Sequence, residues 1–199
     1  MKSKFFETIK VLDGEIYHLF YHQSRYESVL ASLGCSTPQK LSEHIKAPKK
    51  GLFRCKIIYD ATSIEVEFFP YQKREIQTLK ILHCDTIEYA CKSTDRVALD
   101  ALFAQREQCD DVLIVRNNLI TDTSIANIAF HHDDLWYTPK TPLLRGTTRQ
   151  RLLNEGKIIE ADIRVEDLGI YTQVALLNAM IEFDIIAQEN VREIMCLKM

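Results

Sequence analysis

Hydrophobic and polar positions in the first half of the chain alternate between strand-like and helix-like patterns. Residues 5–12 are rich in strand formers, and the Asp13-Gly14 pair that follows them is typical of a two-residue hairpin turn. Apolar residues recur at helical spacing over 19–33, and Pro38 opens a second short helical pattern. The pattern therefore predicts strands over 5–12, 16–18, 51–59 and 62–69 and helices over 19–33 and 38–45.

The second half of the chain consists mainly of short β-rich segments separated by turn residues. The exception is an amphipathic pattern in which Val97, Leu99 and Leu102 mark one helical face. Predicted strands cover 78–84, 111–115, 119–121, 125–130, 135–137 and 174–177, and predicted helices cover 95–108 and 146–153. Because strands and helices come in mixed order rather than as regular βαβ units, the fold class is α+β.

A chain of 199 residues is long enough for one large domain or two small lobes. We place the joint near residues 84–94, where the pattern changes. This predicts a smaller N-terminal α/β lobe of residues 1–86 and a larger C-terminal lobe of residues 87–199.

Composition and charge exclude several classes of function. The formal net charge is -3, and lysines and arginines are scattered among acids, so no basic surface for nucleic acid or anionic lipid is expected. No apolar run approaches the roughly 20 residues that a membrane helix needs, and Glu7 and Asp13 interrupt the region of a signal peptide. The six cysteines contain no CxxC pair and are interpreted as reduced thiols. A cytoplasmic protein without a membrane or nucleic-acid partner is predicted.

Lys92 is the first residue that could carry chemistry. It follows the apolar-leaning Tyr89-Ala90-Cys91 segment and precedes a predicted helix. A lysine held at a strand end between two lobes can lose solvent, which makes its amine nucleophilic. The alternative is a solvated surface lysine, which is the commoner case for such a position.

Asp122 is a second candidate, because it closes a predicted strand and small polar residues such as Ser124 follow it. A carboxylate in such a place could receive a protonated ring nitrogen. The alternative is a local turn in which the Asp122 side chain bonds to nearby backbone and Asn127 is a second turn residue.

Anion-binding groups are expected at two further places. Gly146-Thr147-Thr148-Arg149 opens a predicted helix, whose first amides attract phosphate, although Thr147 or Thr148 could equally be an ordinary N-cap. Arg54 lies within a β-rich run, where an inward-pointing guanidinium would bind an anion with two hydrogen bonds. Outward-facing arginines are commoner on strands. The histidine and aspartate run at 131–134 is interpreted as a hairpin tip, so no metal site is predicted.

These motifs, taken in order, resemble the class IV aminotransferases, the fold-type IV pyridoxal phosphate enzymes. The family includes branched-chain and D-amino acid aminotransferases and 4-amino-4-deoxychorismate lyase. The four matching stretches are Phe6-Glu7-Thr8-Ile9 with Asp13-Gly14 and 22–25, Lys92-Ser93-Thr94-Asp95-Arg96, residues 120–128, and 137–139 with 144–149. Each stretch is weak alone, but the ordered set is specific and spans most of the chain.

The resemblance implies a two-lobed fold, like that of D-amino acid aminotransferase, with the cofactor in the cleft between the lobes. It implies Lys92 as the Schiff-base lysine and as the catalytic acid and base. Asp122 would be the partner of the ring nitrogen, although the family normally has Glu there. The remaining cofactor-binding residues implied are Arg54, Ser124, Thr147 and Thr148. A homodimer is also implied.

Within the family, the Lys-x-x-x-Arg loop and the late Leu177-Asn178-Ala179-Met180 are similar to the lyase branch. The first expectation is therefore a folate-pathway lyase that expels pyruvate from 4-amino-4-deoxychorismate and forms 4-aminobenzoate. The alternatives are an aminotransferase of D- or branched-chain amino acids and a non-catalytic homologue that binds pyridoxal phosphate. The region before residue 80 is shorter than usual for the family, which affects substrate recognition more than cofactor binding.

Overall fold

The chain divides into two units, and the smaller one is built from two separate segments. The computed structural model describes residues 4–188, 191, 194 and 195. The smaller unit comprises Met1–Lys73 and Cys91–Asp95, and the larger unit comprises Arg74–Ala90 and Arg96–Met199. The boundary expected between residues 86 and 87 falls inside the Arg74–Ala90 segment, because the strand at 79–83 pairs within the larger unit.

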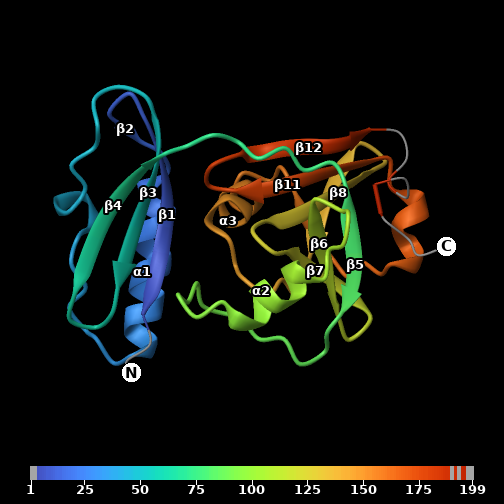
Figure 1. Cartoon of the computed structure of the whole chain (residues 1–199), viewed down its shortest axis with the longest axis horizontal. Helices are drawn as coiled ribbons and strands as arrows, with labels where there is room; N and C mark the ends of the chain where they lie inside the picture. The colour runs from blue at the N-terminus through green and yellow to red at the C-terminus, as the bar shows by residue number, and fades with distance from the viewer. Residues whose placement is uncertain (1–3, 189–190, 192–193, 196–199) are drawn as a thin grey trace. The chain divides into compact units, whose positions relative to one another are not determined.

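The smaller unit contains a four-stranded antiparallel sheet with strand order β2-β1-β3-β4 (Figure 1). Its elements are β1 Phe5–Leu12, β2 Glu15–Ile16, α1 Leu19–Ser32, the 3-10 helix η1 Leu41–Glu43, β3 Leu52–Tyr59 and β4 Ile64–Pro70. Side chains of a strand point alternately to its two faces, so Phe5, Glu7, Ile9 and Val11 are buried while the residues that alternate with them are half-buried. Tyr26 and Leu30 of α1 join the same core.

An eight-stranded sheet organises the larger unit, with the path β10-β9-β8-β7-β6-β5 and with β11 paired to both β8 and β12. Its strands are β5 Leu79–His83, β6 Asp111–Arg116, β7 Leu119–Thr123, β8 Asn127–His132, β9 Leu135–Pro139, β10 Ile159–Ala161, β11 Gln173–Asn178 and β12 Glu182–Gln188. Its helices are α2 Val97–Ala104, α3 Thr147–Asn154 and the 3-10 helix η2 Glu166–Ile170. The β5–β6 and β9–β10 pairs are parallel, and the other pairs are antiparallel.

Most predicted elements of the chain are confirmed, with four differences. The return strand expected over 16–18 is Glu15–Ile16, because Tyr17 lies in a turn and His18 has a left-handed backbone conformation. The prediction of a helix over 38–45 is wrong, because only a 3-10 helix at Leu41–Glu43 forms there. Leu41 and Ile45 are the only buried residues of that range. The helix expected over 95–108 is shorter, at Val97–Ala104. The strand expected from residue 125 begins at 127, because Thr123 closes a turn by accepting a hydrogen bond from the Ala126 amide at 3.0 Å. Three elements were not predicted, namely β10, η2 and β12.

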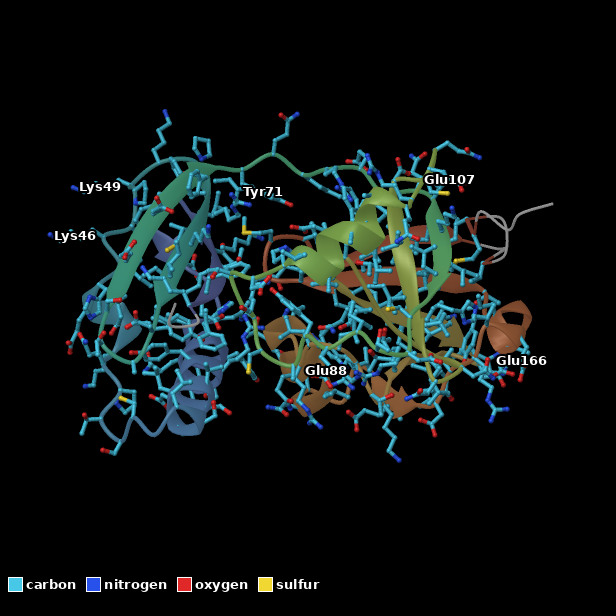
Figure 2. All side chains as sticks on the ribbon, turned by 60° about the horizontal axis from the view of Figure 1, so that its bottom comes forward. Lys46, Lys49, Tyr71, Glu88, Glu107 and Glu166 are labelled. Atoms are coloured by element: carbon cyan, nitrogen blue, oxygen red, sulfur yellow. The ribbon has the colours of Figure 1, made fainter. Side chains whose placement is uncertain are left out.

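Several charged side chains are exposed on the surface of their unit, among them Lys46 and Lys49 of the smaller unit and Glu88 and Glu166 of the larger one (Figure 2). Among the described residues, no helix has both the length and the apolar character required to cross a membrane.

The cysteines differ from expectation at one position. Four of them are free thiols, namely Cys35, Cys55, Cys84 and Cys91. Cys109, however, is disulfide-bonded, so the prediction of reduced thiols is wrong there.

Candidate active site

Lys92 lies on the short segment Cys91–Asp95, which belongs to the smaller unit although α2 of the larger unit follows it. The carbonyl oxygen of Lys92 accepts a hydrogen bond from the amide of Phe6 at 2.8 Å. The amide of Thr94 donates to the carbonyl of Lys4 at 2.9 Å. These bonds hold the segment beside the first residues of β1, so the position of Lys92 is determined by the sheet.

The side chain of Lys92 is half-buried, and its Nζ lies 4.7 Å from the centroid of the Phe6 ring. The Nζ of Lys56 on β3 lies 5.6 Å from the same centroid. A cation over an aromatic face gains about 0.5–1 kcal/mol at a partly exposed site. Phe6 therefore orients two amines on the sheet face opposite to buried Ile9.

Arg54 is also on β3, but it is exposed and its guanidinium carbon lies 5.0 Å from the ring centroid of Phe69. Phe69 is its partner across the β3–β4 pair. The guanidinium thus faces outward over an aromatic ring rather than into the core. Its role as a phosphate ligand stays a prediction.

A buried charged network in the smaller unit was missed by the sequence reasoning. Glu7 is fully buried and accepts two hydrogen bonds from Arg25, from Nε to Oε1 at 2.8 Å and from Nη2 to Oε2 at 2.5 Å. Nδ1 of His22 lies 2.7 Å from Oε2 of Glu7. The signal was available, since Glu7 shares the alternation of buried Phe5 and Ile9, and His22 and Arg25 are three residues apart on one helical face.

The network has defined charges at neutral pH. Burial disfavours a charge on Glu7, but the charge of Arg25 and the hydrogen bonds from His22 and Arg25 lower the pKa of Glu7 to about 2. Burial lowers the pKa of His22, and repulsion by Arg25 and Lys92 adds to this effect against the attraction of Glu7. Glu7 is therefore ionised and His22 is neutral.

Asp122 is buried on β7, with only 4% of its surface exposed. Its Oδ1 accepts a hydrogen bond from Nδ2 of Asn127 at 2.7 Å, and its Oδ2 accepts one from the amide of Leu144 at 2.8 Å. Burial raises the pKa of Asp122 to about 6, although these hydrogen bonds and the charge of Arg149 oppose the shift. The alternative of a local turn is wrong, because the carboxylate bonds to the backbone of Leu144, far along the chain.

The start of α3 lies close to Asp122 through these contacts. Gly146 is the N-cap of α3, with φ -69° and ψ 146°, and no side chain caps the helix. Thr147 and Thr148 are its first helical residues and are 7% and 4% exposed. The alternative of a threonine N-cap is therefore wrong. Neither threonine hydroxyl makes a hydrogen bond to another residue that the structure describes.

These groups fit a phosphorylated pyridine. The first amides of a helix have no partner within it, so Thr147 and Thr148 present donors suited to a phosphate. Asp122 offers a carboxylate in a water-poor place, which suits a protonated ring nitrogen. Both features belong to the larger unit, whereas Lys92 and Arg54 belong to the smaller unit.

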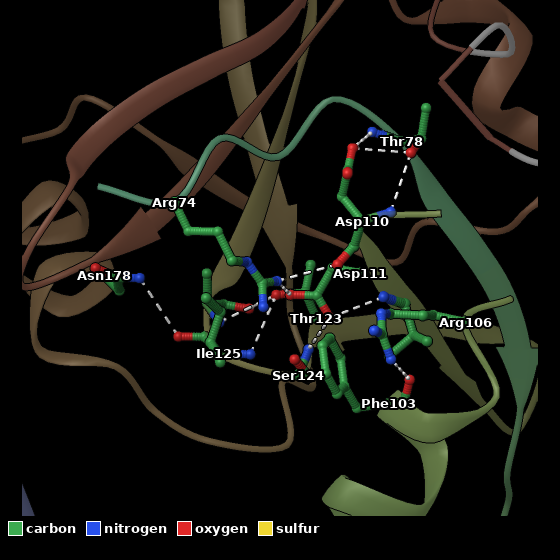
Figure 3. A network of polar contacts seen from close by, with 12 residues as sticks. Arg74, Thr78, Phe103, Arg106, Asp110, Asp111, Thr123, Ser124, Ile125 and Asn178 are labelled. Atoms are coloured by element: carbon green, nitrogen blue, oxygen red, sulfur yellow. Dashed lines mark hydrogen bonds and ion pairs between the residues drawn. The ribbon is translucent and has the colours of Figure 1, made fainter. Parts of the chain in front are cut away.

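Ser124 is occupied by a neighbouring network (Figure 3). Its amide lies 3.4 Å from Oδ1 of Asp111, and Nη2 of Arg74 lies 3.1 Å from Oδ2 of the same carboxylate. Burial raises the pKa of Asp111, and hydrogen bonds from Ser124 and Val112 oppose the shift. A cofactor contact of Ser124 stays a prediction.

Comparison with known proteins identifies relatives across nearly the whole chain. The family model "Amino-transferase class IV" matches residues 4–188. An uncharacterised protein of Haemophilus influenzae is 40% identical over 181 residues, which is 88% of this chain and 96% of that protein. A candidate aminodeoxychorismate lyase of Schizosaccharomyces pombe is 30% identical over 206 residues, with 89% of this chain and 86% of that protein covered.

Solved structures show the same fold. A candidate 4-amino-4-deoxychorismate lyase of Haemophilus somnus is 37% identical, with a TM-score of 0.84, over 90% of this chain and 97% of that chain. The branched-chain amino acid aminotransferase of Escherichia coli has a TM-score of 0.74 at 15% identity and covers 96% of this chain and 82% of its own. The predicted α+β class and the predicted fold-type IV architecture are confirmed.

Proposed function

The chain belongs to the class IV aminotransferase family, whose members are pyridoxal phosphate enzymes, and we propose that it is a 4-amino-4-deoxychorismate lyase. The reaction would eliminate pyruvate from 4-amino-4-deoxychorismate and leave 4-aminobenzoate, a step of folate biosynthesis. One observation supports the proposed cofactor site: the buried carboxylate of Asp122 is hydrogen-bonded to the segment that precedes α3. The lyase assignment is supported by the candidate lyases that are 37% and 30% identical to this chain.

Lys92 is proposed to bind the cofactor covalently through Nζ and then to move protons. When bound, pyridoxal phosphate supplies an electron sink for the carbanion formed at the amine-bearing carbon. The amine of Lys92 would act there as the general base that takes the proton from the amine-bearing carbon of the substrate. Phe6, whose ring centroid lies 4.7 Å from Nζ, keeps this amine at the face of the sheet.

Asp122 is proposed to face the ring nitrogen. With a pKa of about 6, its carboxyl is mostly ionised at pH 7, and a cationic neighbour would stabilise that ionised form further. The residues proposed for the phosphate are Arg54, Thr147 and Thr148, and Ser124 is proposed to complete the cofactor-binding set.

The same residues could also support transamination, so an aminotransferase is the second candidate. The two reactions are separated by supplying 4-amino-4-deoxychorismate to the purified protein and, separately, a panel of D- and L-amino acids with a keto-acid acceptor. Formation of 4-aminobenzoate and pyruvate supports the lyase. Amino-group transfer without 4-aminobenzoate formation contradicts it, and a protein that binds the cofactor but performs neither reaction would be the non-catalytic homologue.

We also propose that the enzyme works in the cytoplasm as a homodimer. Among the described residues, Phe20 and Val97 are the most exposed of the large apolar side chains, at 72% and 77%. An interface between copies would cover such surface. Light scattering at micromolar concentration with the cofactor bound should give twice the chain mass. A monomer under these conditions contradicts the proposal.

A further inference from the structure

Asn127 connects the two features of the larger unit that fit the cofactor. Its Nδ2 donates to Oδ1 of Asp122 at 2.7 Å and to the carbonyl oxygen of Leu144 at 2.8 Å. The amide of Leu144 in turn donates to Oδ2 of Asp122 at 2.8 Å. The three residues therefore form a closed ring of hydrogen bonds that joins β7, β8 and the segment before α3.

The orientation of the Asn127 amide follows from its partners. The Asp122 oxygen and the Leu144 carbonyl oxygen are both acceptors, so the NH2 group of Asn127 must face them. Oδ1 of Asn127 then points to the other side, where it lies 2.0 Å from the place that a Cβ on residue 146 would occupy. The φ of Gly146, -69°, is open to any L-residue. Contact with Asn127, and not backbone conformation, therefore excludes a side chain at residue 146.

We propose that Asn127 is a positioning residue of the cofactor site: one side-chain amide holds the Asp122 carboxylate and the start of α3 in a fixed relation. Gly146 is a glycine because Oδ1 of Asn127 fills the place of its Cβ. The inference rests on the proposed function, in which Asp122 faces the ring nitrogen and α3 receives the phosphate.

Two different substitutions should then have the same consequence. Asn127→Ala removes the amide, whereas Gly146→Ala places a methyl group on Oδ1 and displaces the amide from both acceptors. In either variant the Asp122 carboxyl keeps the backbone donors of Leu143 and Leu144 and the charge of Arg149 but loses the Asn127 donor. The ionised form of Asp122 is therefore less stable, and its titration moves to higher pH.

The test is a double-mutant cycle on the cofactor-free protein. Urea unfolding is measured from pH 4 to 8 for the parent, Asn127→Ala, Gly146→Ala and the double variant, each with and without Asp122→Asn. The difference between the members of each pair isolates the titration of Asp122. We expect both single variants to raise the midpoint of the Asp122 titration by about one pH unit or more. This corresponds to about a tenfold change in the ionisation constant of Asp122, as expected for the loss of one hydrogen bond to a charged group.

In the double variant, Gly146→Ala should add nothing to the effect of Asn127→Ala. Asn154→Ala, on the exposed end of α3, is the matched control and should leave the midpoint unchanged. The proposal is overturned if Gly146→Ala leaves the midpoint at the parent value, or if the two effects add. If Asn127→Ala does not fold, Asn127→Ser carries the same comparison.

A second readout is the dissociation constant of pyridoxal phosphate, which should rise about tenfold or more in Asn127→Ala and in Gly146→Ala. Equal affinity in the parent and both variants contradicts the positioning role. The unfolding cycle needs no cofactor. Its outcome therefore stands apart from the proposed function, which fails separately if Lys92 does not bind pyridoxal phosphate.

Discussion

Replacing Asp122 by Asn should change the pH dependence of stability in a direction that the burial of Asp122 determines. The folded-state pKa of Asp122 is about 6, against 3.8 for an ordinary aspartate. Because the pKa of Asp122 is raised in the folded state, Asp122 contributes most favourably to the free energy of unfolding below pH 3.8. This contribution is lost as the pH rises through 6. Asn does not titrate and is nearly isosteric with Asp, so the Asp122→Asn variant does not lose this stability as the pH rises.

The magnitude follows from the same two pKa values. A shift of about 2 units corresponds to about 3 kcal/mol, of which about 2–3 kcal/mol develops between pH 4 and pH 7. One of the donors from Asn127 and Leu144 would face the NH2 group of the new asparagine, which subtracts a constant of about 1–3 kcal/mol at every pH. The prediction is therefore a slope: the unfolding free energy of the variant relative to the parent rises by about 2–3 kcal/mol from pH 4 to pH 7.

The assay is urea unfolding of the cofactor-free parent and variant at half-unit pH intervals. Groups such as Glu7 and Asp111 titrate in both proteins, so their effects cancel in the difference. Asp162→Asn, which removes an exposed carboxylate of the same unit, is the matched control. A difference between Asp122→Asn and the parent that stays constant from pH 4 to 7 would refute the reasoning.

Three further predictions concern the smaller unit and the reaction. Glu7→Gln should lower the unfolding free energy by about 3–5 kcal/mol at pH 7, because Arg25 is left without its buried partner. The parent should lose the same stabilisation as pH falls from 4.5 through about 2, where Glu7 is protonated; denaturant titrations that show no loss contradict both statements. Arg54→Ala should weaken pyridoxal phosphate binding by about 1.5–3 kcal/mol, and an unchanged dissociation constant speaks against a phosphate contact. Asp122→Asn should slow turnover about 10²–10³-fold while the cofactor still binds, and a parent-like rate would leave Asp122 without a catalytic role.

Local patterns predicted the strands of the smaller unit well, because its sheet buries one face and the alternation along β1 and β3 is visible in sequence. They failed at β12, Glu182–Gln188, whose mixture of charged and apolar residues becomes a strand only by pairing with β11. Long-range pairing of this kind leaves no clear local period.

The candidate site was predicted unevenly for the same reason. Lys92, Asp122, Thr147 and Thr148 follow from short ordered motifs, and the structure places Asp122 against the start of α3. The Glu7 network was missed because a charged residue on a strand is usually assigned to the solvent face. Glu7 is, however, two residues from both Phe5 and Ile9, so its side chain points to the same buried face of the strand.

The role of Asn127 could not be read from sequence, since it depends on a contact with Leu144, far along the chain. From the sequence, Asn127 was predicted only to be a turn residue. In the structure, Thr123 closes that turn and leaves the Asn127 amide to bind Asp122.

The central claim is that Lys92 binds pyridoxal phosphate covalently, and reductive labelling tests it most directly. Purified protein given the cofactor should absorb visible light, lose that band on borohydride reduction, and carry the label on the peptide containing Lys92. Lys56, whose amine shares the Phe6 ring, provides the matched control. Lys56→Ala should still be labelled at Lys92, whereas Lys92→Ala should not be labelled at all. A label on Lys56 or any other lysine of the parent, or a visible band that persists in Lys92→Ala, would contradict the account.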